Sequence, residues 1–165
     1  MTLEDMKYYS ILLGVGETED FNKYINDIIS TDSELDDLSA ELLYESNNIS
    51  KCVDILTNHY RGKIVDDKIV ACKLITFIKT NLLYNRLNKI EAIEMLVKFS
   101  KEANKLSEDT IKEPWATMKL LGFLLDKDNT IILDSYFDNF INHGKTLTGD
   151  SEFEDIFNRI INKWI

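Results

Sequence analysis

The side chains best suited to nucleophilic or metal chemistry are few in this 165-residue chain. Two cysteines, Cys52 and Cys72, and two histidines, His59 and His143, are present. There is no C-x-x-C, and Cys52, His59 and Cys72 match none of the usual zinc-ligand spacings. Both thiols fall on or beside apolar stripes, which predicts buried free cysteines. Each histidine stands near a predicted helix C-terminus, where the helix dipole favours an imidazolium, so capping roles are predicted for both.

Closely spaced carboxylates are the other candidates for chemistry. Glu91 with Glu94, and Glu152 with Asp155, have the one-turn spacing with which acidic pairs bind Mg²⁺ in all-helical nucleotide hydrolases. The two pairs lie much farther apart in the sequence than in the compact MazG-like pattern, to which they bear a superficial likeness. A Mg²⁺-dependent nucleotide hydrolase is therefore the least favoured function, and the sequence predicts no enzyme, no catalytic residue, no metal site and no cofactor.

The net charge of −10 is spread unevenly along the chain. Residues 1–60 hold 13 acidic and 3 basic side chains. Residues 61–105 hold 5 acidic and 10 basic side chains, and residues 106–165 hold 11 acidic and 6 basic ones. The basic middle does not predict nucleic-acid binding, because its lysines are spread round a helix and the whole chain repels phosphate. Docking of this middle against the acidic first third is the simpler interpretation.

The strongest concentration of charge lies between residues 32 and 45, where there is no lysine or arginine. Four of its carboxylates recur at i, i+3, i+7 and i+11, which places them on one stripe of a helix and leaves them without neutralising neighbours on that helix. The partner-binding residues predicted on this basis are Asp32, Glu34, Asp37, Glu41 and Glu45. The alternative interpretation is a hydrated helix face that keeps an acidic protein in solution, with acidic first turns that suit the helix dipole.

Cap residues followed by apolar residues at helical spacing predict the elements that must position these side chains. About eight to nine helices are expected, with residues 105–113 as a loop and Gly144 as a C-terminal stop. The expected caps or first residues are Thr2, Thr18, Ser33, Asn47 or Asn48, Asp66 or Asp67, Asn88, Pro114, Asn129 or Thr130, and Asp150 or Ser151. Short strands at Lys63–Val65 and Thr130–Leu133 are a weaker alternative, because neither segment is followed by the turn residues that are typical of a β-hairpin.

Composition points to the same fold class. One proline and six glycines are too few for a domain with many tight turns. We predict one all-α domain over residues 1–165, either an irregular helical bundle or a short α-hairpin array of the HEAT-like kind.

The N-terminal residues lack the basic and apolar regions of a signal peptide, and no stretch approaches the length of a membrane span, so a cytoplasmic protein without a membrane partner is expected.

The acidic stripe at Asp32–Glu45, the helical patterns and the lack of a catalytic motif together resemble the small acidic all-helical immunity proteins of bacterial polymorphic-toxin systems. The resemblance implies a protein that binds a cognate toxin, often a basic nuclease, and blocks its active site. A toxin-neutralising protein with a basic protein partner is therefore the first hypothesis. A helical-repeat adaptor or regulatory scaffold is the alternative. Oligomeric state is not predicted.

Overall fold

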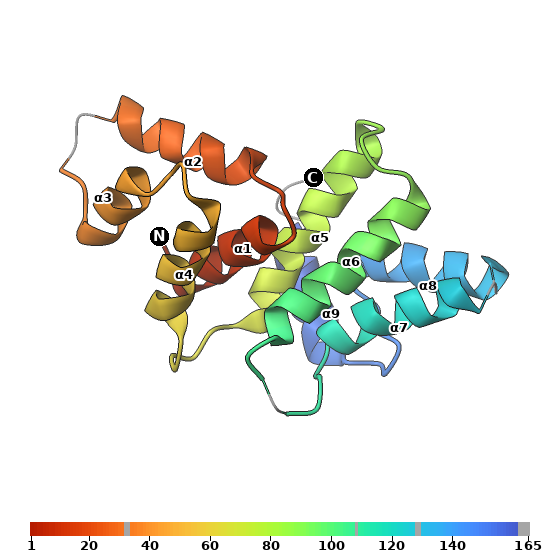
Figure 1. The fold of residues 1–165 in the computed structure, drawn as a ribbon. Helices are drawn as coiled ribbons and strands as arrows, with labels where there is room; N and C mark the ends of the chain where they lie inside the picture. The colour runs from red at the N-terminus through yellow and green to blue at the C-terminus, as the bar shows by residue number, and fades with distance from the viewer. Residues whose placement is uncertain (32–33, 108, 128–129, 162–165) are drawn as a thin grey trace. The chain divides into compact units, whose positions relative to one another are not determined.

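A computed structural model describes residues 1–31, 34–107, 109–127 and 130–161. These residues form nine α-helices and no strand, which confirms the all-α class (Figure 1). The helices are α1 (Leu3–Gly14), α2 (Glu19–Ser30), α3 (Asp37–Tyr44), α4 (Ile49–Tyr60), α5 (Asp67–Leu83), α6 (Lys89–Asn104), α7 (Trp115–Asp126), α8 (Thr130–His143) and α9 (Ser151–Ile161). The strand alternative is wrong at both segments: Thr130–Leu133 begins α8, and Lys63–Val65 lies in the connection between α4 and α5. None of the described helices is both long and apolar enough to cross a membrane.

The chain divides into two compact units, Met1–Val65 and Asp66–Ile165. In the first unit the most extensive helix contact joins α1 and α4, which are distant in sequence. In the second unit α6 packs on its neighbour α7, and α5 packs on the distant α9. Stacked α-hairpins would pair neighbours throughout, so an irregular bundle describes each unit better than an array. The single domain expected over residues 1–165 stays a prediction.

The first unit closes around a core in which Phe21, Leu42, Cys52 and Leu56 are fully buried. Tyr9 and Tyr24 pack beside Phe21, with ring centroids 5.9 and 6.2 Å from it. Tyr60 from α4 shares a 3.0 Å hydrogen bond with the Ser10 hydroxyl on α1. Helix α3 contributes Leu38 and Leu42 to the same core, which is what attaches it to the unit.

The second unit is built on larger aromatic side chains. Trp115, Phe99, Phe140, Phe153 and Phe157 are almost completely buried. The Trp115 indole N–H donates to the Asp67 carboxylate at 3.1 Å, so the start of α7 is tied to the start of α5. Helix α6 packs chiefly on α7, and the two run side by side in Figure 1.

Most of the expected caps are present. The capping boxes Thr2 with Asp5 and Asn88 with Glu91 are confirmed, with each side chain accepting from the other residue's backbone N–H. Asn48 and Asp66 cap α4 and α5, as predicted. Asp150 accepts from the Phe153 amide and so caps α9. Pro114 precedes Trp115, the first residue of α7, and Gly144 follows α8 with φ +65°.

The predicted caps of the second and third helices differ from what the structure shows. Thr18 precedes α2, as predicted, but its side chain makes no capping hydrogen bond. The third helix begins at Asp37 and its cap is Asp36, whose carboxylate accepts the Ser39 amide at 2.7 Å. The predicted cap, Ser33, lies outside the described residues, as does Asn129.

Both cysteines are fully buried free thiols, as the sequence predicts. Burial raises the pKa of the Cys72 thiol to about 12 and, less strongly, that of Cys52. The Cys52 thiol donates to the Glu45 carbonyl oxygen at 3.2 Å. These thiols are therefore packing groups of the two cores and not nucleophiles.

Gly122 of α7 lies directly against the Val97 side chain of α6, and this contact supplies a test of the packing. A Cβ at Gly122 would overlap the Val97 side chain on α6. Gly122→Ala should therefore destabilise the second unit by about 1–3 kcal/mol, despite the roughly 1 kcal/mol of helix propensity that alanine adds. Urea unfolding followed by tryptophan fluorescence reports on this unit, because both tryptophans follow residue 66.

The double variant Gly122→Ala with Val97→Ala is the control for that prediction. Removing the Val97 methyl groups makes room for the new Cβ, so the double variant should lose less stability than the two single changes added together. If the losses in free energy of unfolding of the two single variants simply add up in the double variant, the two helices do not meet at this point.

Candidate protein-binding surface

One side of α3 is exposed and carries charge. Asp37, Glu41 and Tyr44 lie at i, i+4 and i+7, so they share one side of the helix, here called the α3 face. All three are exposed, whereas Leu38 and Leu42 on the other side are buried. The burial of Leu38 and Leu42, here called the apolar seam, thus fixes which side chains of α3 point to water.

Further contacts hold α3 in this orientation. The buried Ser39 hydroxyl lies 3.1 Å from the Tyr24 hydroxyl of α2. At the start of the helix, the hydrogen bond from the Ser39 backbone amide lowers the pKa of the Asp36 carboxyl. An ionised Asp36 beside the helix N-terminus also suits the helix dipole. The cap and the seam together give the α3 face a defined position on the first unit.

The predicted binding residues do not form the continuous ridge that the spacing indicated. Asp37 and Glu41 are on the α3 face, and no ion pair joins either of them to a described residue. Glu34 is exposed, but it precedes the helix. Glu45 is the C-terminal cap and forms an ion pair with Lys51 at 3.2 Å, so its charge is partly neutralised. Asp32 lies outside the described residues.

Tyr44 is a feature of this surface that the sequence analysis missed. Its side chain is 86% exposed, the most of any described aromatic residue. The signal was available, because Tyr44 continues the i, i+4 spacing of Asp37 and Glu41 by one more turn. An exposed tyrosine beside two carboxylates offers a large apolar contact area in an acidic setting, which is common at protein interfaces.

The first unit holds most of the net negative charge. Residues 1–65 contain 13 acidic and 5 basic side chains, for a net charge of −8, whereas residues 66–165 contain 16 and 14, for −2. A charge of this size on a small unit attracts cations over about a Debye length, roughly 8–10 Å at physiological salt.

The basic middle of the chain pairs with the acidic last third. Lys68 contacts the carboxylates of Asp150 and Glu152 at 3.4 and 2.8 Å. Burial alone would lower the pKa of Lys68, but its hydrogen bonds and ion pairs with these two carboxylates raise it. Lys89 similarly lies 3.4 Å from Asp134 and from Asp138.

One carboxylate of each pair considered for Mg²⁺ already has a structural partner. Glu91 accepts the Asn88 amide at 2.8 Å in its capping box, and Glu152 is paired with Lys68. Among the residues that the structure describes, no cluster of three or more His, Cys, Asp or Glu side chains could hold a metal ion. The described part of the chain therefore gives the hydrolase hypothesis no assembled site.

Comparison with known proteins adds no family assignment. The chain matches no family model, and it matches no curated protein and no solved structure. Its function must be argued from its own surface.

The Asp36 cap is testable by substitution and by pH. Asp36→Ala should lower the free energy of unfolding by about 1 kcal/mol at pH 7, because the Ser39 amide loses its acceptor. The folded pKa of Asp36 is below the unfolded value of about 3.9, so the wild-type cap is fully ionised above that pH and its contribution fades as the pH falls through the folded pKa. The difference in free energy of unfolding between wild type and Asp36→Ala should therefore become smaller at low pH. Urea unfolding followed by far-UV circular dichroism measures this difference.

Asp36→Asn is the matched control, since its amide oxygen still caps the helix without titrating. It should stay within a few tenths of a kcal/mol of wild type at pH 7. Equal losses for the Asn and Ala variants would show that Asp36 stabilises α3 through its charge and not through the hydrogen bond that it accepts from the Ser39 amide.

Proposed function

We propose that this chain is a binding protein whose α3 face contacts a basic surface on another protein, in the manner of an immunity protein that neutralises a toxin. The observation that carries the proposal is the arrangement of Asp37, Glu41 and Tyr44: two carboxylates without an ion pair to a described residue, beside a tyrosine that is 86% exposed.

The electrostatics of the face favour a cationic partner. Like charges at i and i+4 cost an isolated helix roughly 0.2–0.5 kcal/mol, and a partner's lysine or arginine would offset that cost. The net charge of −8 on residues 1–65 would also speed the encounter. Exposed surface pairs add little affinity by themselves, so the charges chiefly supply rate and selectivity.

Tyr44 would supply the affinity that the charges lack. Tyrosine is over-represented among the interface residues that carry most of the binding energy. Its ring can pack against an arginine or lysine of the partner through a cation–π contact. A basic nuclease would meet both requirements, and binding at its active site would compete with nucleic acid for the same cationic side chains.

The adaptor alternative predicts a different genomic setting and a different surface. An adaptor of stacked repeats would present a concave array of neighbouring helices, whereas α1 packs on α4 and α5 packs on α9. A large toxin gene directly upstream would support the immunity function and disfavour the adaptor.

Reversing the charges of the α3 face tests the proposal. Asp37→Lys combined with Glu41→Lys should abolish co-purification of basic proteins in a pull-down from the native host, because both carboxylates are replaced by ammonium groups. Wild-type capture should weaken as salt is raised. The matched control is Glu94→Lys with Asp155→Lys, which makes the same change in net charge on exposed residues of the second unit.

Capture that survives the α3 reversal at low salt would reject this surface as the binding site. Equal loss in both double variants would show that net charge alone, and not the α3 face, governs association.

Tyr44 can be tested with the captured partner once it is purified. Tyr44→Ala should raise the dissociation rate at least tenfold, whereas Tyr44→Phe should stay within about threefold of wild type, because the ring supplies most of the contact. Surface plasmon resonance separates this effect from charge reversal, which should act mainly on the association rate. An unchanged dissociation rate in Tyr44→Ala would place the contact elsewhere.

A further inference from the structure

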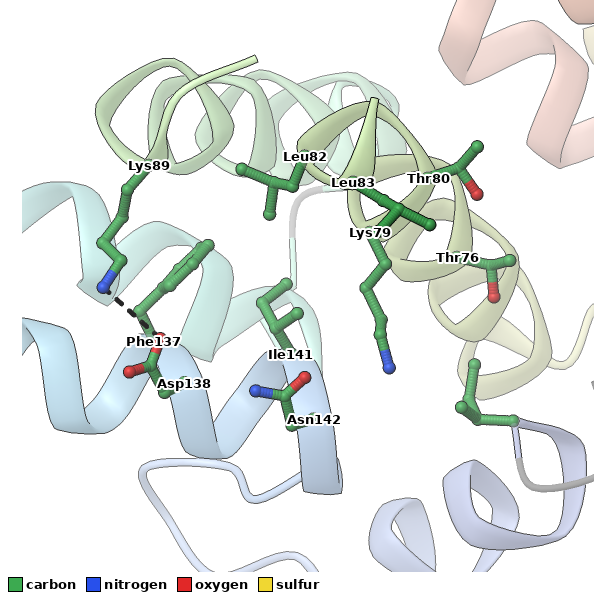
Figure 2. Close-up of a pocket in the computed structure, with 11 residues that line it drawn as sticks. Thr76, Lys79, Thr80, Leu82, Leu83, Lys89, Phe137, Asp138, Ile141 and Asn142 are labelled. Atoms are coloured by element: carbon green, nitrogen blue, oxygen red, sulfur yellow. Dashed lines mark ion pairs between the residues drawn. The ribbon is translucent and has the colours of Figure 1, made fainter. Parts of the chain in front are cut away.

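The second unit contains a cavity of about 600 Å³ that plays no part in the proposed protein binding. It lies among the C-terminal half of α5, the start of α6, α8 and the last residue of α9 (Figure 2). This volume falls within the range of roughly 300–1,000 Å³ that is usual for small-ligand sites.

The walls of this cavity are largely apolar. Phe137 and Ile141 of α8 and Ile161 of α9 contribute side chains that are almost fully buried. Leu82 and Leu83 of α5 contribute further apolar surface, and Leu83 is 75% exposed, so it stands at an open rim. Such walls would remove the apolar body of a ligand from water.

The two lysines of the cavity differ in their state of pairing. Lys89 lies 3.4 Å from Asp138 and 5.7 Å from the centroid of the Phe137 ring, so its charge is already balanced. Lys79 is half-buried, and no carboxylate of the described part of the chain pairs with it. Figure 2 shows the Lys79 amine extending into the hollow, on the side where Ile141 and Asn142 project from α8.

We propose that this cavity binds a small organic monoanion with an apolar body, of which a medium-chain carboxylic acid is the simplest example. The ligand carboxylate would accept from the Lys79 ammonium and from the Asn142 amide, while its chain would lie against Leu82, Phe137 and Ile141. The Lys79 ammonium has no carboxylate partner in the described chain, and a ligand carboxylate would supply one through a charge-assisted hydrogen bond.

The charge of the site argues for a monoanion over a phosphate dianion. Lys79 is the one lining cation that lacks an ion pair in the described chain, and the described lining contains no arginine. The net charge of −2 on residues 66–165 opposes more highly charged ligands. Phosphate sites generally use arginine forks or several backbone amides, which this lining does not provide.

Titration of the full chain with decanoate tests the proposal, by calorimetry and by ¹⁵N–¹H correlation spectra. Decanoate should shift amide peaks of α5 and α8, whereas acetate, which lacks an apolar body, and octan-1-ol, which lacks a charge, should bind much more weakly. Lys79→Gln should weaken decanoate binding about tenfold, the size expected for a charge-assisted hydrogen bond. The matched control Lys98→Gln removes an exposed lysine of α6 outside the cavity and should leave the affinity unchanged.

A second variant keeps the test independent of any effect of Lys79 on folding. Leu83→Glu changes an exposed rim residue and places a carboxylate near Lys79, so it should also weaken decanoate binding at least tenfold without loss of stability. The proposal is overturned if decanoate binds the Lys79→Gln protein as tightly as wild type, if octan-1-ol binds as tightly as decanoate, or if no amide of α5 or α8 responds. Because the α3 face is unaltered in these variants, capture of a basic partner should not change, and the two proposals can fail separately.

Discussion

The burial of Leu38 and Leu42 is the constraint on which the acidic surface depends. Helix α3 has only eight residues, far fewer than the roughly 12–15 that an isolated helix needs in water. It persists because these two leucines pack into the core of the first unit and because Asp36 caps its first turn. Because the apolar side of the helix is anchored, its opposite side is exposed to solvent. That side carries Asp37, Glu41 and Tyr44. The orientation of the candidate site is therefore a by-product of core packing.

The two units distribute charge in different ways. The second unit uses many of its charges in structural contacts: Lys68 ties the start of α5 to the start of α9, and Lys89 links α6 to α8. The first unit has too few cations for its carboxylates, so several acidic side chains remain hydrated. A surface that only served solubility would need no particular aromatic residue beside those charges. The exposed ring of Tyr44 is what separates a candidate interface from a merely hydrated helix.

Local signals made most of the fold predictable from the sequence. The caps at Thr2, Asn48, Asp66 and Asn88 depend on contacts within three residues, so pattern alone identifies them. The start of α3 was misplaced because Ser33 and Asp36 are both good caps. A start at Ser33 would have placed Leu35 in the helix, but Leu35 precedes α3 and is exposed. Whether Leu35 is buried is a tertiary effect that the local pattern does not show.

The candidate sites were less predictable for the same reason. Tyr44 was overlooked because aromatic residues are usually buried, and only the packing of α3 shows that this one is not. The cavity needs α5 and α8 to meet, and the sequence separation between Lys79 and Asn142 leaves no local trace of that meeting. The ion pairs of Lys68 with Asp150 and Glu152 likewise span more than 80 residues.

The placement of the two cysteines has a practical consequence for studying this chain. Cys52 belongs to the core of the first unit and Cys72 to that of the second, and both are sealed from solvent in the folded state. Alkylation of either sulfur thus requires its own unit to open. Peptide mass spectrometry after timed exposure to iodoacetamide would give the alkylation rates of Cys52 and Cys72 in one sample, with no label or engineered residue. Equal rates are expected if the two units unfold together, and unequal rates if each unit opens separately.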